Sequence, residues 1–212
     1  MSGQVGKEET VPAWPRPAEF NAPFLISEKI DGTHVALAVT EIDAARAVPE
    51  GAISVTVGGK RWMLRAASRL RWLTDERDNF GFRAWVREHA APLVGLGPGL
   101  HRGEWYGQGI QRAYGLDERR WALFDAERWT KLPEGLPEAV EVVPVLARVP
   151  GPRLPQAVDT ALRTLQSTGS LAVFGQRAEG LVIASAHAPS VRFTVPLSRT
   201  GGPARGQELS KN

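Results

Sequence analysis

The stretch ISEKIDGTHVALAV, residues 26–39, decides the fold and raises the question of function. Its apolar second half predicts a strand over HVALAVTE, residues 34–41, with one buried face. Lys29 lies just before this strand, two residues ahead of the pair Asp31-Gly32. Lysine is scarce in the chain: it occupies positions 7, 29, 60, 131 and 211, and the other 21 of the 26 basic residues are arginine.

Two interpretations of Lys29 are open at this point. In the simpler one it is a charged residue at a turn, which is what a K-x-D-G tetrapeptide alone favours. In the other, the Asp-Gly turn projects the amine into a cleft. A lysine amine becomes a nucleophile when desolvation or a cationic neighbour favours its neutral form, whereas the guanidinium of arginine stays protonated. A required amine would explain why a lysine persists in an arginine-rich chain.

The bulk composition predicts one soluble globular domain. The chain has 212 residues, 42% of them hydrophobic and 23% charged, which is enough to bury a sizeable core. The formal charge is +3 and the pI about 9.6. Because arginine matches phosphate oxygens with a planar fork, the bias suits a nucleotide or nucleic-acid partner. Genome composition would produce the same bias, and both explanations remain open.

Several classes of site are excluded or disfavoured. The sequence has no cysteine, which excludes disulfides, thiol nucleophiles and cysteine-ligated zinc. Its four histidines are dispersed and lack metal-ligand spacing. The N-terminus has no apolar signal segment, and no run approaches membrane-spanning length. We therefore expect a cytoplasmic protein without membrane association.

The pattern along the chain predicts an α+β fold with mainly antiparallel sheets and flanking helices. We expect a disordered tail over residues 1–12, one domain over 13–197 and a flexible tail over 198–212. A hairpin is predicted over 52–68 around Gly58-Gly59, and helices within 79–95 and 154–169. Strands are expected over 120–129, 139–149, 179–185 and 190–197, the second of them an edge or bulged strand because Pro144 interrupts it.

Four further segments hold candidate chemistry, each with an ordinary structural explanation when taken alone. Glu104 lies in the glycine-rich run GLHRGEWYGQGIQRAYG, residues 99–115, which could equally be an exposed loop. Phe124-Asp125 ends an apolar strand, and Glu179 precedes another. In VRFTVPL, residues 191–197, Arg192 and Thr194 share one strand face.

Taken in order, these segments resemble the covalent nucleotidyltransferase superfamily, and within it the ATP-dependent RNA ligases. EKIDGTH resembles the first motif, with His34 where asparagine is usual, and ASRLRWLT, residues 67–74, resembles a Ser-Arg motif. RGEWYGQGIQ, residues 102–111, is similar to the glutamate motif, and EGLVIAS to a late acidic motif. The resemblance covers about residues 14–197.

The resemblance implies a role for each matching residue. Lys29 would attack the α-phosphorus of ATP to form lysyl-AMP, which then activates a 5′-phosphate end for joining to a 3′-hydroxyl of RNA. Magnesium or manganese is implied, with Asp31, Glu104 and Glu179 as its contacts. The implied nucleotide-binding residues are Glu28 near the adenine, Ile30, Asp31, Gly32, Arg69 at ribose or phosphate, Glu104, Phe124 stacking on the purine, Glu179 and Arg192.

The chain departs from this pattern in its last motif. Ligases of this kind place lysine where VRFTV has Arg192, and Arg199 is a candidate substitute. The sequence also ends soon after this motif, so RNA would bind to the basic surface of the core. Candidates for that surface are Arg61, Arg65, Arg71, Arg102, Arg112, Arg119 and Arg120. A nicked RNA duplex as substrate, a protein partner that supplies specificity, a DNA nick ligase, a capping-type enzyme and a non-catalytic nucleotide-binding or RNA-binding relative remain alternatives.

Overall fold

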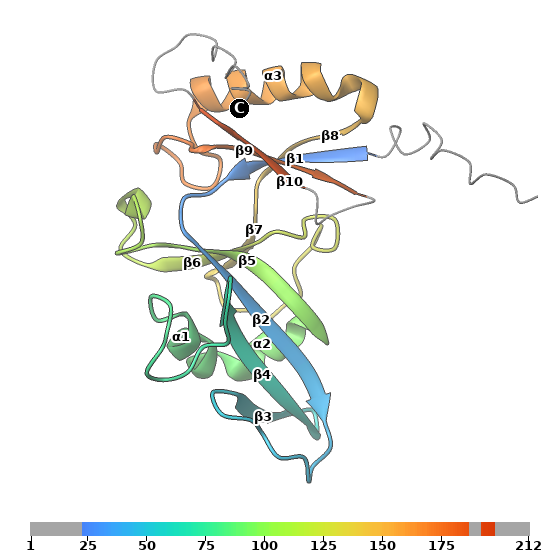
Figure 1. Ribbon diagram of the computed structural model, residues 1–212, viewed down its shortest axis with the longest axis vertical. Helices are drawn as coiled ribbons and strands as arrows, with labels where there is room; N and C mark the ends of the chain where they lie inside the picture. The colour runs from blue at the N-terminus through green and yellow to red at the C-terminus, as the bar shows by residue number, and fades with distance from the viewer. Residues whose placement is uncertain (1–22, 187–191, 198–212) are drawn as a thin grey trace, which may run out of the picture.

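The computed structural model describes residues 23–186 and 192–197. The predictions for the two tails, and for Arg199, fall outside these residues. Within the described ranges the strands form two sheets, which we term sheet A and sheet B. The two sheets lie one above the other in Figure 1 and are joined directly where β1 continues into β2. The α+β fold with mainly antiparallel sheets is therefore confirmed.

Sheet A has four antiparallel strands in the order β10-β9-β1-β8. Their bounds are β1 Pro23–Lys29, β8 Val145–Pro150, β9 Gly180–Ser185 and β10 Arg192–Pro196. Helix α3, Leu154–Thr168, covers one face of this sheet (Figure 1). Ile26, Leu165 and Leu181 are fully or almost fully buried between helix and sheet. The other face of sheet A points toward sheet B.

Sheet B has six strands in the order β3-β4-β2-β5-β6-β7. Their bounds are β2 Thr33–Ile42, β3 Ile53–Val57, β4 Lys60–Ser68, β5 Gly99–Gly107, β6 Arg119–Leu123 and β7 Val140–Val142. All neighbouring strands are antiparallel except β6 and β7. The short helices α1, Phe82–Glu88, and α2, Ala90–Leu93, pack on one face. Short 3-10 turns occupy Val94–Leu96, Ala113–Gly115 and Gly151–Arg153.

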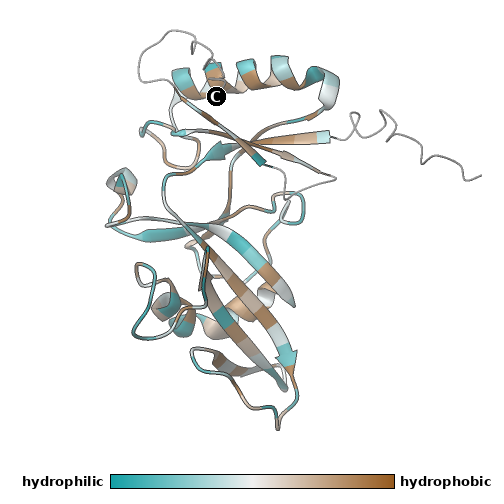
Figure 2. Ribbon diagram, viewed as in Figure 1, coloured by the Kyte–Doolittle hydropathy of each residue, from teal (hydrophilic) through white to brown (hydrophobic). Residues whose placement is uncertain are grey.

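Alternation along the strands explains which face of sheet B is buried. Val35, Leu37 and Leu64 belong to the core beneath α1 and α2, together with Trp105 and Trp121. Figure 2 shows the corresponding change between hydrophobic and hydrophilic residues along β2 and β4. The opposite face of these strands is not covered by any helix among the described residues (Figure 1).

Locally encoded elements match the sequence predictions. The hairpin turns at Gly58 and Gly59, whose φ angles of 59° and 76° suit the tight turn that the pair predicted. Helix α3 ends at Gly169, with φ 79°, as expected. In the segment 79–95, Phe82, Val86 and Leu93 point into the core, but His89 breaks the expected helix into α1 and α2.

Expectations for three segments need correction, and the first is the strand expected over 120–129, which ends at Leu123. The segment 139–149 is not one strand: Pro144 separates β7, at the edge of sheet B, from β8, at the edge of sheet A. A proline lacks the N–H that a continuous ladder needs, so the chain changes sheets there. The glycine-rich run that begins at Gly99 is not an exposed loop but starts with β5, which lies inside sheet B between β2 and β6.

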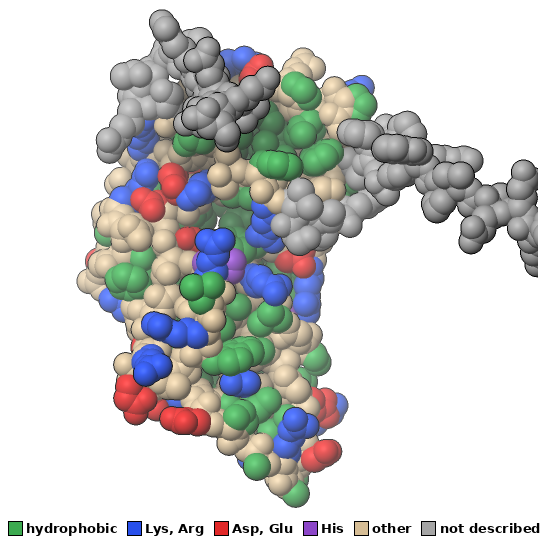
Figure 3. All heavy atoms as spheres, in the orientation of Figure 1, with side chains coloured by type: hydrophobic (Ala, Val, Ile, Leu, Met, Phe, Trp, Pro, Cys, Tyr) green, Lys and Arg blue, Asp and Glu red, His purple; other side chains and the backbone are tan. Residues whose placement is uncertain are grey.

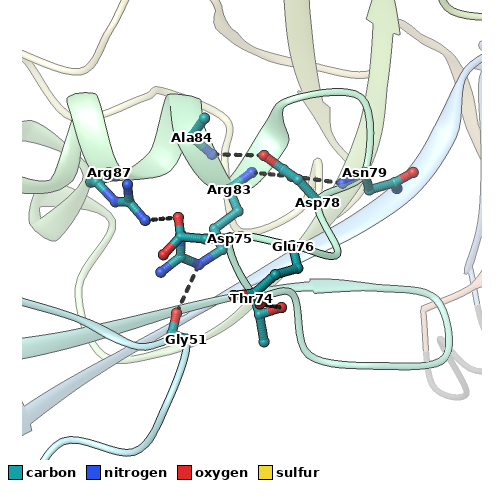
Figure 4. Close-up of polar contacts among 9 residues, drawn as sticks. All are labelled: Gly51, Thr74, Asp75, Glu76, Asp78, Asn79, Arg83, Ala84 and Arg87. Atoms are coloured by element: carbon teal, nitrogen blue, oxygen red, sulfur yellow. Dashed lines mark hydrogen bonds and ion pairs between the residues drawn. The ribbon is translucent and has the colours of Figure 1, made fainter.

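The loop before α1 is held by two aspartates (Figure 4). Asp78 accepts hydrogen bonds from the backbone N–H groups of Asn79, Arg83 and Ala84 at 2.6, 2.8 and 3.0 Å. A carboxylate at this end satisfies unpaired donors of the first helical turn and suits the helix dipole. Asp75 pairs with both Arg83 and Arg87. The loop is therefore anchored, and it carries Asn79 to the side of Thr33, whose hydroxyl accepts a 3.0 Å hydrogen bond from Asn79 Nδ2.

No helix among the residues described here combines the length and the apolar character that crossing a membrane requires.

Candidate active site

A cleft of about 850 Å³ separates sheet A from sheet B and contains most of the predicted site. Figure 3 shows a hollow at the middle of the molecule with basic side chains around it. Of the ten residues singled out from the sequence, eight line this cleft: Glu28, Lys29, Ile30, Gly32, Arg69, Glu104, Phe124 and Arg192. Residues from β1, β2, β4, β5, β9 and β10 meet there, because β1 runs into β2 across the junction of the sheets.

Lys29 is the last residue of β1 and faces an acid from a neighbouring strand. Its Nζ lies 2.6 Å from Glu179 Oε1, and the two side chains are 32% and 25% exposed. The pairing follows from strand register, since Lys29 lies opposite Gly180, the residue after Glu179. The other carboxylate oxygen, Glu179 Oε2, is buried and has no hydrogen-bond partner among the described residues. Glu179 thus holds the lysine amine with one carboxylate oxygen, and its second oxygen could accept a hydrogen bond or bind a cation.

Glu104 approaches the same point from sheet B. It lies opposite His34 in the β2–β5 ladder. The pKa of Glu104 is raised to about 7, chiefly by burial; the nearby Glu179 and Asp31 carboxylates also raise the pKa, whereas Lys29 and the backbone N–H of Gly32 lower it. A buried carboxyl with this pKa carries a proton for part of the time at neutral pH, and a cation placed beside it would remove that proton.

Asp31 does not join the other two acids. Its Oδ2 accepts a 2.8 Å hydrogen bond from Arg112 Nε, and its backbone N–H donates to the Tyr114 hydroxyl at 2.7 Å. Asp31 and Glu179 line a separate hollow of about 510 Å³ together with Arg112. Among the described residues no three acidic or histidine side chains converge closely enough to hold a metal ion. Asp31 thus pairs with Arg112 while Glu179 pairs with Lys29, and the predicted contacts of Asp31, Glu104 and Glu179 with a metal ion stay a prediction.

Glu28 is fixed by a loop that sequence reasoning missed. The side chain is 1% exposed, and its two oxygens accept hydrogen bonds from Ser170 Oγ at 2.5 Å and from the backbone N–H groups of Leu171 and Ala172 at 2.7 and 3.1 Å. Ser170 Oγ also accepts from the backbone N–H of Val173 at 3.0 Å. The loop after α3 thus holds the Glu28 side chain, and a Gly-Ser pair after a helix was the only sequence signal of that loop.

Phe124 lies between two groups that the fold brings from opposite sheets. The Arg192 guanidinium carbon is 5.2 Å from the centroid of the Phe124 ring, within cation–π range. His34 meets the same ring edge-on, with centroids 5.1 Å apart and planes at 66°. Burial lowers the pKa of His34, and the Arg192, Arg69 and Arg102 charges lower it further. The cleft therefore combines an aromatic wall with a positive potential, which suits an anionic ligand that carries a ring.

Gly32 is required by the close approach of two strands. A Cβ at this position would lie 2.5 Å from the carbonyl oxygen of Trp105 and 2.8 Å from Tyr106 Cβ. Its backbone contact with β5 is what carries Glu104 to the side of Lys29. Ile30, 4% exposed, packs into a small core cluster with Tyr106 and Tyr114. The Asp-Gly pair thus acts through packing and through Arg112, and it forms a bend between β1 and β2, not the predicted tight turn.

Four of the arginines predicted to form a nucleic-acid surface also have partners within the protein. Arg61 donates to the backbone oxygens of Ala44 and Arg46 at 2.7 and 2.9 Å. Arg119 donates to the backbone oxygens of Gln108 and Phe80 at 2.9 and 2.8 Å. Arg112 and Arg120 pair with Asp31 and Glu118. Of the remaining candidates Arg71 and Arg102 are exposed and Arg65 is half-buried against Trp72, while Arg69 lies at the cleft rim.

Comparison with solved structures finds a similar fold in an RNA ligase. The described chain is similar to solved structures of the RNA ligase of Naegleria gruberi. One point mutant with ATP and Mn has a TM-score of 0.54 at 17% identity, over 84% of this chain and 51% of that chain. A second point mutant with ATP and Mn gives 0.53 at 16% identity, over 84% and 51%. The ligase with PPi gives 0.52 at 16% identity, over 84% and 50%.

These likenesses, at 16–17% identity, show that the chain shares the fold of the matched part of the RNA ligase structures. The chain spans about half the length of the ligase structures it matches. No protein-family model matches the sequence. No curated protein matches it either.

Proposed function

We propose that this chain, through a single domain over residues 13–197, is an ATP-dependent RNA ligase. Lys29 takes AMP from ATP, and the AMP then activates an RNA 5′-phosphate for sealing to a 3′-hydroxyl. The observation that carries the proposal is the position of Lys29, whose Nζ lies 2.6 Å from Glu179 at the cleft that Glu104 and Phe124 also face. The Naegleria structures with ATP, Mn and PPi support it through their shared fold.

The reaction consists of three displacements at phosphorus. Lys29 Nζ forms a bond to the α-phosphorus of ATP as the bond to pyrophosphate breaks, and the amine gives up a proton. A 5′-phosphate oxygen of RNA then displaces the lysine, and a 3′-hydroxyl finally displaces AMP. Such displacements depend on alignment and charge neutralisation more than on covalent assistance. Holding the amine between Glu179 and the floor of the cleft provides that alignment.

The nucleotide fits the cleft by the chemistry of its walls. Phe124 offers its ring to the purine, and stacking of this kind is worth about 1–3 kcal/mol per base. Arg192 and Arg69 lie on opposite rims of the cleft and would contact phosphate or ribose oxygens. Glu28 lines the cleft, is held by the backbone of the 170–172 loop and would lie near the adenine. Arg192, which lies over the Phe124 ring, would thus supply the positive charge that a lysine supplies in the last motif of the ligases.

Magnesium or manganese fits beside the same acids. Glu104 and Glu179 present oxygen donors, one of which, Glu179 Oε2, is buried without a partner among the described residues. Magnesium is commonly held by one or two carboxylates together with waters and substrate phosphates, so two acids are sufficient. The ion, when bound, would neutralise phosphate charge.

An adenylylation assay tests the proposal. Incubated with α-labelled ATP and Mg²⁺ or Mn²⁺, the protein should form an acid-labile, alkali-stable covalent AMP adduct. Lys29→Ala and Lys29→Arg should both abolish it, because the site needs an amine and not only a positive charge. Lys60→Ala is the matched control: Lys60 is exposed and pairs with Glu41, so its loss should leave the adduct intact. An adduct that survives Lys29→Ala would refute the assignment.

Labelling with GTP, strand-sealing assays and ATP-binding measurements separate the alternatives. Labelling by GTP in preference to ATP would indicate a capping-type enzyme. Sealing of nicked DNA without sealing of RNA ends would indicate a DNA ligase. ATP binding with no adduct and no pyrophosphate release would indicate a nucleotide-binding protein without catalysis. This alternative is suggested by Arg192, which occupies the position where the ligases usually have a lysine.

A further inference from the structure

The face of sheet B opposite α1 and α2 continues the cleft floor and has an unusual composition. On β2, Leu37 points into the core, whereas Ala36 and Ala38 point to the other side. Ala38 lies between Arg65 on β4 and Leu100 on β5, and Ala36 lies between Ala67 and Arg102. We call the surface formed by Ala36, Ala38, Arg65, Leu100 and Arg102 the open face. The small residues Ala36, Ala38 and Ala67 therefore form a floor beside taller basic and apolar side chains, and Ala36, only 5% exposed, is covered by its neighbours.

Large apolar side chains border the open face. Trp72 forms an isolated bridge with Ala67 and is 44% exposed. The Arg65 guanidinium carbon lies 4.1 Å from the centroid of a Trp72 ring, so the indole is held against the sheet. Leu100 is 42% exposed and Leu70, at the tip of the turn after β4, 91%. Surface tryptophan and leucine side chains gathered in this way are typical of a binding surface.

The charge of the same region is positive. Arg65, Arg69, Arg71 and Arg102 form no ion pair with any described carboxylate. Figure 3 shows basic side chains around the central hollow and hydrophobic side chains on the surface below it. An apolar protein partner would not require this arginine excess, whereas a polyanion with stackable rings would use both the arginines and the indole.

We propose that the open face binds the RNA strand whose end lies at Lys29, an inference that rests on the proposed ligase function. From His34, at the cleft, to Ala38 the floor extends over four residues, or roughly 13 Å at about 3.3 Å per residue. This length accommodates about four stacked nucleotides at about 3.4 Å each. Trp72 stacks on a base, Arg65 and Arg102 contact phosphates on either side of the alanine floor, and the strand leaves past Leu100.

Binding of a fluorescein-labelled 12-nucleotide RNA with a 5′-phosphate, followed by anisotropy, tests the inference. Trp72→Ala should weaken binding about 5- to 100-fold, since stacking on an aromatic ring is lost. Trp72→Phe, which keeps an aromatic ring, should recover most of that loss. Arg65→Ala should weaken binding and lower the slope of log Kd against log salt by about 0.7, the value for one contact to a single-stranded phosphate.

Two control variants test whether the loss of RNA affinity is specific to the open face. Adenylylation without RNA tests the ligase proposal separately. Arg163→Ala and Phe174→Ala, on helix α3 and in the loop after it, remove an exposed arginine and a 98% exposed aromatic ring away from the open face. Neither should change RNA affinity. Arg65→Ala and Trp72→Ala should still form the AMP adduct without RNA. If they form it and bind RNA as the unchanged protein does, or if the controls lose as much affinity, the inference is wrong. A missing adduct on the unchanged protein would instead count against the ligase proposal.

Discussion

Arg112 Nε lies 2.8 Å from Asp31 Oδ2, and the same guanidinium donates from its NH1 group to the backbone oxygen of Arg177 at 3.0 Å. One side chain thus ties the turn after Lys29 to the segment that leads into Glu179. The loop that supplies Arg112 is itself strained: Gln111, Ala113 and Tyr114 have φ angles of 46°, 54° and 52°. Non-glycine residues are rarely held in this region unless their surroundings impose it.

Arg112→Lys should slow formation of the AMP adduct about tenfold while changing ATP affinity little. Lysine keeps the charge but cannot donate to Asp31 and to the Arg177 backbone at once, so the two segments flanking Lys29 lose their common tie. Single-turnover labelling and equilibrium ATP binding measure the two effects separately. A loss of ATP affinity that matched the loss of rate would contradict a positioning role.

Arg119→Lys is the matched control for that experiment. Arg119 also bridges two backbone oxygens, those of Gln108 and Phe80, but it does not contact Asp31. This variant should lose a comparable amount of stability and keep the rate of adduct formation. Equal slowing in both variants would mean that stability, and not the position of Lys29, explains the result.

Gly32→Ala should destabilise the fold and reduce adduct formation at least tenfold. The added methyl group would lie 2.5 Å from the Trp105 oxygen and 2.9 Å from Glu104 Cγ, so β5 would have to move away from the lysine. Overpacking of this kind costs about 1–3 kcal/mol. Urea denaturation gives the stability loss and labelling gives the activity loss. Gly95→Ala serves as control, because a Cβ there would meet Leu136 at an ordinary 3.6 Å; normal stability of Gly32→Ala would contradict the packing argument.

The elements that the sequence predicted well are those fixed by neighbouring residues. The hairpin at Gly58-Gly59 and helix α3 depend on local turn chemistry and on a 3.6-residue apolar repeat. Strand β5 was missed because its glycines resemble a loop. Gly103 and Gly107 are explained only by the partner strand, where a Cβ would lie 2.4 Å from the Ala122 oxygen and 2.3 Å from the Glu118 oxygen.

In the candidate site, too, residues in local motifs could be predicted and long-range partners could not. Lys29, Glu104, Phe124 and Glu179 could be selected from motifs along the sequence, and the structure brings Lys29 and Glu179 together. The partners of Asp31 and Glu28 could not be predicted from the sequence, because their hydrogen bonds join residues that are 81 and 142 positions apart. Contacts of that kind depend on how two sheets are arranged, which no local pattern encodes.

Glu28→Gln should lower the free energy of unfolding by about 2–3 kcal/mol, because hydrogen bonds to an ionised group are worth more than neutral ones. All the donors around this buried carboxylate come from one loop, and an amide would present N–H groups to some of them. Urea denaturation at pH 7 measures the change. Glu41→Gln, which removes an exposed partner of Lys60, should cost less than about 1 kcal/mol. Equal effects of the two variants would contradict a special role for the Glu28 loop.

Glu104→Gln should make the protein more stable at alkaline pH when no metal is present. Burial raises the pKa of Glu104 from an ordinary 4.5 to about 7, so the folded state binds more protons than the unfolded state between these values. Stability contributed by this group is complete below about pH 4.5 and is lost as pH rises toward about 7. The glutamine variant escapes that loss, and the gain at pH 8 should approach roughly 3 kcal/mol.

The same substitution should remove the benefit of a divalent ion. Urea denaturation at pH 5 and pH 8, with and without Mn²⁺, measures both effects. In the unchanged protein Mn²⁺ should stabilise more at pH 8 than at pH 5, since only the ionised carboxylate binds the metal. Glu104→Gln should reduce this difference and abolish adduct formation despite its greater stability. A variant that is less stable than the unchanged protein at pH 8 would show that Glu104 is not held at a raised pKa by burial.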